Sequence, residues 1–247
     1  MSRTVHSEDV SFPRGGDEIR GYLALPGEGT PRPGLVLIPD VRGLYEHYRD
    51  VARRFAGEGF ATLALDLYSR EGAPELADLE AVRRWIAGLP DARVLADITA
   101  AVDYLAGRSE VGGRAVGITG YCMGGQYALM AACSVPRLAA CVSWYGMLRY
   151  AETNERKPES PLAMASRLGC PYLGLFGEED GLIPLADVEE LAATLGLAGK
   201  DFTIVTYPGA GHAFFNDARP DAYRPHVARE AWGTAIGFLR DKLGACG

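Results

Sequence analysis

The sequence lacks the features that mark several large classes of protein. None of its five cysteines forms a CxxC pair, so neither a zinc site nor a disulfide framework is indicated, and reduced thiols are expected. It has no basic block, and 25 Lys and Arg against 32 Asp and Glu give a net charge of −7. This balance argues against nucleic acid or an anionic membrane as the main partner. No apolar run approaches the roughly 18 to 20 residues of a membrane helix.

The first twenty residues also lack the apolar stretch of a secretory signal, because acidic and basic side chains interrupt them. We therefore expect a cytoplasmic protein. The 247 residues carry no internal repeat, low-complexity tract or domain linker. Because single α/β domains often reach about 200 to 250 residues, one domain spanning residues 1–247 is predicted.

Short apolar runs rich in β-formers alternate with amphipathic helical stretches. This alternation is typical of an α/β fold with a mainly parallel central sheet and helices on both faces. Several runs are continuously apolar, as in strands buried on both faces. The predicted strands are Glu18–Leu25, Gly34–Pro39, Phe60–Asp66, Arg114–Gly120, Leu138–Tyr145, Pro171–Gly177 and Asp201–Pro208.

Apolar residues recur at helical spacing in two further stretches, Tyr48–Ala56 and Val94–Leu105, which predicts two helices that face the core. A third helix is expected after Met123. A fourth covers about 185–195, and a last one runs from about Pro225 to Leu243. The polar stretch Arg149–Ser160 is interpreted as an exposed loop.

The most informative segment joins a predicted strand directly to a helix rich in small residues. At the junction, Gly120-Tyr121-Cys122-Met123-Gly124 matches the nucleophile-elbow pattern G-x-nucleophile-x-G, with Cys in place of the usual Ser. A side chain at position 120 or 124 would collide with the adjoining strand or helix. The N-terminus of the following helix favours a thiolate at Cys122. The alternative is that Cys122 only packs as a small hydrophobic residue, but the strand-to-helix context favours the nucleophile.

A thiol nucleophile needs a base, and His212 is the best of four histidines. It lies in a Gly-rich loop directly after the last predicted strand, where parallel sheets place their sites. His6 and His226 are interpreted as solvated side chains, whereas His47 either lines a pocket or faces water.

A carboxylate should orient this imidazole. Glu178, Glu179 and Asp180 follow a predicted strand, and any of them could serve or lie in an exposed turn. Asp180 is preferred because Gly and Ile-Pro follow it. The chain order nucleophile, acid, His is that of α/β-hydrolases. The N–H groups of Val41 and Met123 are the expected oxyanion hole.

Six segments, in this order and spacing, resemble the dienelactone hydrolase (carboxymethylenebutenolidase) family over about residues 21–239. They are Pro39-Asp40-Val41-Arg42-Gly43-Leu44, Asp66-Leu67-Tyr68, Gly120-Tyr121-Cys122-Met123-Gly124-Gly125, Tyr145-Gly146, Gly177-Glu178-Glu179-Asp180 and Gly211-His212-Ala213-Phe214. The resemblance implies an α/β-hydrolase fold and a metal-free, cofactor-free Cys-His-Asp triad, with Cys122 as nucleophile, His212 as base and Asp180 as its orienting acid. The implied substrates are lactones or other small esters.

Two positions depart from the family pattern. Asp40 stands where members typically carry a Glu that activates the thiol, so it either contacts Cys122 or caps its loop. Asn216 stands where dienelactone-specific members use an arginine to hold the substrate carboxylate. These members use more than one arginine; Arg83 or Arg84 could supply the other one, and Arg42 could substitute from the first loop. Loss of this ion pair favours a broader ester specificity.

Tyr145 and Phe214 are candidates for the pocket wall, by position and by resemblance. The expected partner is a small-molecule ester or lactone, bound by a monomer or homodimer. Two other functions remain open: a broad-specificity carboxylesterase or thioesterase without dienelactone preference, and a catalytically silent hydrolase-fold protein that only binds a ligand.

Overall fold

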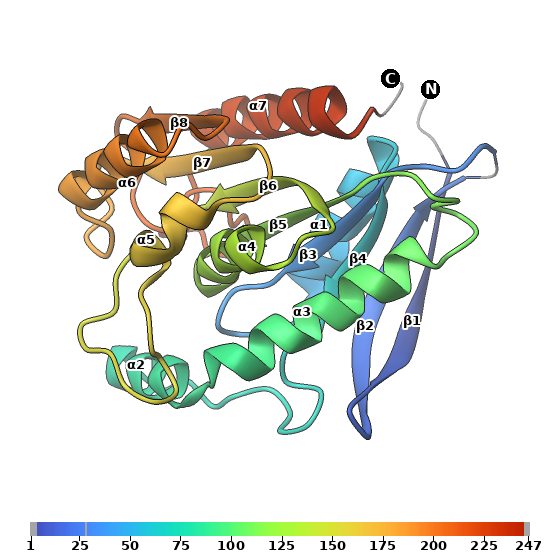
Figure 1. The fold of residues 1–247 in the computed structure, drawn as a ribbon, viewed down its shortest axis with the longest axis horizontal. Helices are drawn as coiled ribbons and strands as arrows, with labels where there is room; N and C mark the ends of the chain where they lie inside the picture. Colours follow the sequence, from blue (N-terminus) through green and yellow to red (C-terminus); the bar gives the residue numbers. More distant parts are fainter. Residues whose placement is uncertain (1–3, 28, 245–247) are drawn as a thin grey trace.

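The computed structural model describes residues 4–27 and 29–244, and its centre is one eight-stranded sheet (Figure 1). The strand order is β1-β2-β4-β3-β5-β6-β7-β8, and β1 and β2 are antiparallel to their neighbours whereas the other six strands run parallel. The strands are β1 (Val5–Arg14), β2 (Asp17–Pro26), β3 (Gly34–Ile38), β4 (Ala61–Leu65), β5 (Val116–Tyr121), β6 (Leu138–Trp144), β7 (Tyr172–Gly177) and β8 (Phe202–Tyr207).

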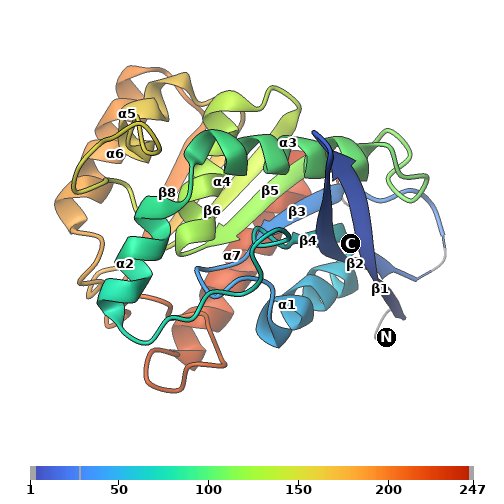
Figure 2. The same ribbon diagram turned by 90° about the horizontal axis from the view of Figure 1, so that it is seen from below.

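Helices cover both faces of the sheet (Figure 2). The helices α1 and α7 pack on one face, and α3 and α4 pack on the other. The helical segments are α1 (Glu46–Gly57), α2 (Leu79–Gly88), α3 (Asp91–Ala106), α4 (Met123–Ser134), α5 (Pro161–Met164), the short 3₁₀ helix η1 (Ala165–Arg167), α6 (Leu185–Leu197) and α7 (Pro225–Leu243). Every helix in the described part of the chain is too short or too polar to cross a lipid bilayer.

The expected fold class is confirmed, and the seven predicted strands are found with ends within two residues of their predicted positions. All residues of β3, β4, β5 and β7 are buried, as continuous apolar runs require. The strand β1 was not predicted, because this edge strand is mostly exposed and carries few apolar residues. The helix α7 begins with Pro225 and ends before Gly244 in a left-handed conformation (φ 68°), the usual start and stop residues of a helix.

Two further differences concern the segments beside the parallel strands. The helix α2 was not among the five predicted helices, and it contains no fully buried residue. The 149–160 loop is exposed over most of its length, as expected, but the prediction is wrong for Lys157, which is 2% exposed. Cys122, Cys133, Cys141 and Cys170 are free thiols, and Cys246 lies outside the described residues.

Candidate active site

The predicted site residues follow the carboxyl ends of five neighbouring parallel strands, where open α/β sheets form their sites. Asp40 to Arg42 follow β3, Cys122 and Met123 follow β5, Tyr145 follows β6, Asp180 follows β7, and His212 and Phe214 follow β8. Residues that are far apart in the sequence therefore meet at one edge of the sheet.

Cys122 lies in the strained turn between β5 and α4. Its backbone has φ 56° and ψ −118°, a conformation that residues with side chains rarely adopt. A Cβ atom on Gly120 would lie 2.0 Å from the carbonyl oxygen of Gly124, and one on Gly124 would lie 2.2 Å from that of Ile38. The two glycines are thus required by the approach of strand, turn and helix. The Cys122 residue remains partly exposed at this turn.

His212 and Asp180 form a hydrogen-bonded pair beside Cys122. The Nδ1 atom of His212 lies 2.8 Å from Oδ2 of Asp180, and the other carboxylate oxygen accepts the N–H of Leu182 at 2.9 Å. The Asp180 side chain is fully buried, whereas the imidazole is 15% exposed. The second ring nitrogen, Nε2, is buried and has no hydrogen-bond partner among the described residues. It is therefore available to a nucleophile or substrate.

The charges around His212 favour its protonated form. Burial lowers the pKa of the imidazole, but the charge of Cys122 and the hydrogen bond to Asp180 outweigh burial and raise the pKa to about 10. A positive charge on the imidazole therefore lies beside Cys122.

The N–H groups of Val41 and Met123 face no acceptor among the residues that the structure describes. Met123 is the first residue of α4, so its N–H has no partner within the helix. The Tyr68 hydroxyl donates to the carbonyl oxygen of Val41 at 2.9 Å and lies 3.8 Å from the sulfur of Met123. Tyr68 thereby contacts both residues, Val41 and Met123, whose N–H groups are the proposed oxyanion donors.

Asp40 is held by three neutral donors and makes no hydrogen bond to Cys122 within the described chain. The N–H of Arg42 donates to Oδ1 at 2.8 Å, and the Tyr45 hydroxyl and Asn216 Nδ2 each lie 3.4 Å from Oδ2. Asn216 is fully buried and also donates to the Tyr45 hydroxyl at 2.8 Å. Asn216 therefore orients Asp40 and Tyr45.

Of the arginines considered for the family positions, Arg42 adjoins this cluster, whereas Arg84 lies away from it. The Arg42 side chain is exposed at the rim, near Asp40 and Tyr45. The Arg84 guanidinium, on the surface of α2, pairs with Glu80. Among the described residues, Asp40 forms no ion pair.

Aromatic side chains enclose the His212 side of the site. The Tyr145 ring stands edge-on to the imidazole with centroids 5.3 Å apart, and Phe214 packs edge-on to Tyr145 at 5.1 Å. Tyr145 adopts a positive φ of 39°, and its buried hydroxyl has no partner in the described chain. Both rings are buried, so they form the wall behind the imidazole.

Sequence reasoning missed the side chains that connect these loops. Tyr68 was named only as part of a segment that resembles the family, and its position after a predicted strand was the available signal. His47 was left open between pocket and solvent; it is 5% exposed, and its Nδ1 lies 2.8 Å from Oδ1 of Asp217. Arg54 also contacts Asp217, at 2.6 Å. No spacing rule indicates this long-range contact.

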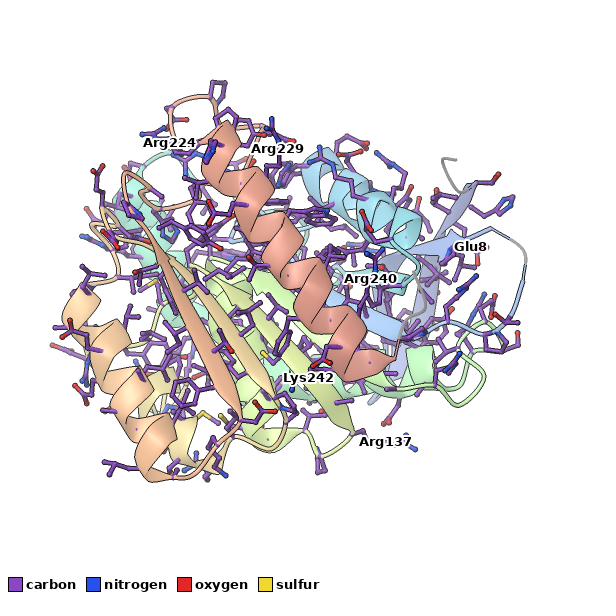
Figure 3. All side chains as sticks on the ribbon, turned by 90° about the horizontal axis from the view of Figure 1, so that it is seen from above. Glu8, Arg137, Arg224, Arg229, Arg240 and Lys242 are labelled. Carbon is purple, nitrogen blue, oxygen red and sulfur yellow. The ribbon has the colours of Figure 1, made fainter. Side chains whose placement is uncertain are left out.

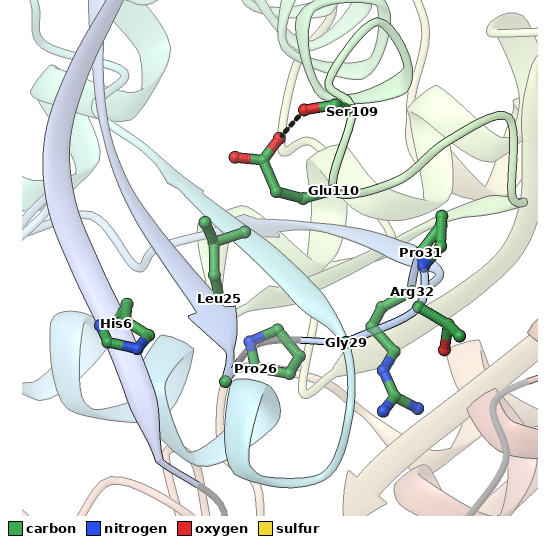
Figure 4. A pocket seen from close by; sticks show the side chains of 10 residues that line it. His6, Leu25, Pro26, Gly29, Pro31, Arg32, Ser109 and Glu110 are labelled. Carbon is green, nitrogen blue, oxygen red and sulfur yellow. Dashed lines mark hydrogen bonds between the residues drawn. The ribbon is translucent and has the colours of Figure 1, made fainter.

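A surface pocket of about 450 Å³ lies elsewhere (Figure 4). His6, Leu25, Arg32 and Glu110 are among its lining residues, and the pocket lies at the amino ends of β3 and β5, opposite Cys122. It is therefore no part of the candidate site. Within residues 4–27 and 29–244, no group of three or more His, Cys, Asp or Glu side chains is arranged to hold a metal ion.

Comparison with known proteins places this geometry in a known class. The crystal structure of a dienelactone hydrolase candidate from Klebsiella pneumoniae superimposes with a TM-score of 0.90 at 33% identity, covering 96% of this chain and 98% of that one. A carboxymethylenebutenolidase candidate from Methylorubrum extorquens is 36% identical, over 91% of this chain and 77% of its own. A candidate 2-oxo-3-(5-oxofuran-2-ylidene)propanoate lactonase from Bradyrhizobium sp. is 34% identical, over 100% of this chain and 98% of its own.

The sheet, the turn at Cys122 and the structural similarity define an α/β-hydrolase fold. The sequence model of the dienelactone hydrolase family matches residues 19–243, so the chain belongs to that family. Its relatives are named as carboxymethylenebutenolidases, and the chain is accordingly a hydrolase of the lactone and carboxylic ester class.

Proposed function

We propose that the protein hydrolyses lactones or small carboxylic esters through a Cys122-His212-Asp180 triad and a thiol-acyl intermediate. The observation that carries this proposal is the cysteine in a strained turn at a helix N-terminus, beside a hydrogen-bonded His-Asp pair. A purely packing cysteine would need neither the strain nor the pair.

In the first half-reaction, the Cys122 thiolate attacks the substrate carbonyl carbon. The negative charge moves to the carbonyl oxygen, which accepts hydrogen bonds from the N–H groups of Val41 and Met123. The protonated His212 gives its Nε2 proton to the leaving alkoxide, and a thioester forms on Cys122. For a lactone, the alcohol stays attached to the acyl group.

In the second half-reaction, the now neutral His212 accepts a proton from water, and the resulting hydroxide attacks the thioester. The carboxylic acid leaves, and the thiolate and imidazolium are restored. Asp180 holds the imidazole in one tautomer through its Nδ1 hydrogen bond. Tyr145 and Phe214 wall the pocket, and Asp40 and Arg42 flank the proposed oxyanion donor Val41 in the loop after β3.

Two substrate preferences are supported by different observations. The relative from Bradyrhizobium is named for a lactone that carries a carboxylate, which favours a lactone substrate. The neutral, buried Asn216 favours instead a broad-specificity carboxylesterase or thioesterase, because no cation stands there to bind a carboxylate.

The test compares dienelactone and p-nitrophenyl acetate as substrates of the wild type, of Cys122→Ala and of the control Cys133→Ala, which removes another half-buried thiol. We expect Cys122→Ala to lose hydrolysis of both substrates while the control keeps it. Preference of the wild type for dienelactone supports the lactonase, and cleavage of the aryl ester alone supports the broad esterase. Equal catalysed rates for wild type and Cys122→Ala would overturn the triad. Rates no higher than the uncatalysed background for both proteins would favour a silent, ligand-binding protein.

Mass spectrometry of enzyme quenched during turnover tests the intermediate directly. We expect the acyl mass on the peptide that contains Cys122 and no acyl mass in Cys122→Ala. An adduct on a different residue, or one that persists in the variant, contradicts the thiol-acyl mechanism.

A further inference from the structure

A buried lysine, Lys157, forms an ion pair outside the triad. Lys157 Nζ lies 2.6 Å from Oδ1 of Asp91 and 2.6 Å from the Tyr127 hydroxyl, and both charged side chains are 3% exposed. The Tyr150 hydroxyl donates to Oδ2 of Asp91 at 2.9 Å, and Gln126 donates to the Tyr150 hydroxyl at 2.9 Å. Both carboxylate oxygens are thereby bound.

This cluster joins three segments that are distant in the sequence. Gln126 and Tyr127 belong to α4, one turn after Cys122, and Asp91 begins α3. Tyr150 and Lys157 belong to the 149–160 loop, which leaves the site directly after Tyr145. The proposed mechanism uses none of these side chains, so their burial calls for another explanation.

The same loop holds the end of α2, as Figure 1 shows where the two lie together. The Arg156 guanidinium donates to the carbonyl oxygen of Gly88 at 3.0 Å, and the Asp91 N–H donates to that of Arg156 at 3.0 Å. The helix α2 has no fully buried residue and packs only the partly buried Val82, Trp85 and Ile86 against the core, so its packing alone constrains its position weakly. Its attachment to the loop adds the polar contacts that hold its end.

The helix α2 in turn reaches the proposed oxyanion loop. Trp85 of α2 stands edge-on to Tyr68 with centroids 5.3 Å apart, and the Tyr68 hydroxyl binds the carbonyl oxygen of Val41. A continuous series of contacts thus connects the buried Lys157 to the loop beside Cys122.

An ion pair this deeply buried is a weak source of stability, because desolvation of the two charges offsets their attraction. Its geometry, by contrast, is specific: two charged groups and two tyrosine hydroxyls satisfy each other in one arrangement. Such a network therefore suits the fixing of a loop in a single position.

We propose that Lys157 is a positioning residue whose buried pair with Asp91 holds the 149–160 loop and α2 as a fixed wall of the Cys122 site, and that this wall limits the size of ester accepted. The 149–160 loop is thus an anchored wall, and it does not open as a lid during turnover. The size limit rests on the proposed hydrolase function, whereas the anchoring of α2 does not.

The test uses Lys157→Met, which keeps the length of the side chain but removes its charge. The matched control is Lys242→Met, at the end of α7, where the lysine forms a partly exposed pair with Asp201 (Figure 3). The kcat/KM for p-nitrophenyl acetate and octanoate, the rate of Cys122 alkylation by iodoacetamide, and hydrogen exchange of residues 79–88 are measured for each protein.

We expect Lys157→Met to reduce the preference for acetate over octanoate by about tenfold, through a lower KM for octanoate, because a looser wall admits the longer chain. The kcat for acetate and the alkylation rate should stay close to wild type. Amide exchange in α2 should be about tenfold faster. The control should change none of these quantities.

An unchanged acetate to octanoate ratio overturns the size limit, and unchanged exchange in α2 overturns the anchoring. The exchange measurement needs no activity, so it decides the anchoring even if the wild type hydrolyses neither ester and the proposed function fails. Should Lys157→Met not fold, the exposed Arg156→Ala takes its place. It must shift the exchange of α2 in the same direction, and its failure to do so likewise overturns the proposal.

Discussion

A methyl group added at Gly124 would lie 2.2 Å from the carbonyl oxygen of Ile38, whereas one added at Gly233 of α7 meets nothing within 4 Å. The same substitution should therefore have opposite effects at the two positions. We expect Gly124→Ala to destabilise the protein by about 3 kcal/mol or more, because backbone must move, and to reduce hydrolysis strongly.

Gly233→Ala should stabilise by up to about 1 kcal/mol, since alanine is the better helix former. Chemical denaturation of both variants measures the difference in the free energy of unfolding. A Gly124→Ala protein as stable as the wild type would show that the close approach of β3 to the turn after β5 is wrong.

His212 should give the stability a characteristic pH dependence. Its pKa is raised from the ordinary 6.5 to about 10 in the folded chain, so the folded state binds the proton more tightly than the unfolded state. The resulting stabilisation is fully present below pH 6.5 and is lost as the pH rises towards about 10. His212→Gln should lack this loss when unfolding is measured by urea titration across that range.

The charge of Cys122 is the largest of the contributions that raise this pKa. In Cys122→Ala, stability should therefore be lost over a narrower range of pH than in the wild type. Identical pH profiles for the two proteins would mean that the thiol does not interact with the imidazole.

At the scale of the elements, two side-chain hydrogen bonds join the start of α1 to the loop that carries His212. Tyr45 binds Asn216, and His47 binds Asp217, which also contacts Arg54. The loop before α1 supplies the proposed oxyanion donor, and the loop after β8 supplies the base. These hydrogen bonds therefore fix the distance between the two loops.

Burial of His47 should make the protein less stable in acid. Burial lowers the pKa of His47 below its ordinary 6.5, and the opposing charge of Asp217 does not compensate fully. The unfolded state then binds the proton more readily, so stability falls as the pH drops below 6.5. His47→Gln should lose part of this acid sensitivity in urea titrations, whereas His226→Gln, at the exposed start of α7, should not. Equal slopes for wild type and His47→Gln would contradict the buried position of the imidazole.

The sequence indicated those elements whose apolar pattern reflects their burial. The strands β3 to β8 and the helix α7 carry such patterns. The strand β1 does not, because it is an exposed edge. The helix α2 carries only a short stripe of partly buried residues, Val82, Trp85 and Ile86. Lys157 was misjudged for a related reason: a lysine in a polar segment is usually solvated, and only the contact with Asp91, 66 residues away, buries it.

At the scale of the whole molecule, the meeting of Cys122, Asp180 and His212 could be predicted because each follows its own strand in a family pattern. The partners of Asp40 could not, since Asn216 lies 176 residues away and reaches it only through the fold. The roles of the site residues, the single domain, the cytoplasmic location and the monomeric or homodimeric state stay predictions.

The overall charge bears on the choice between anionic and neutral substrates. The chain carries a net charge of −7, and the Asp40 carboxylate near the oxyanion loop has only neutral hydrogen-bond partners among the described residues. We therefore expect a substrate carboxylate to be repelled by the net charge and by Asp40, and dissolved salt to screen that repulsion.

We expect kcat/KM for an anionic lactone to rise about twofold to tenfold between low salt and about 0.5 M salt. The value for a neutral aryl ester, measured alongside as the control, should stay flat, because no charge on the substrate is screened. A decrease for the anionic lactone would instead mean that a cation attracts it. Arg42, exposed at the rim, would be that cation, and Arg42→Ala should then abolish the decrease.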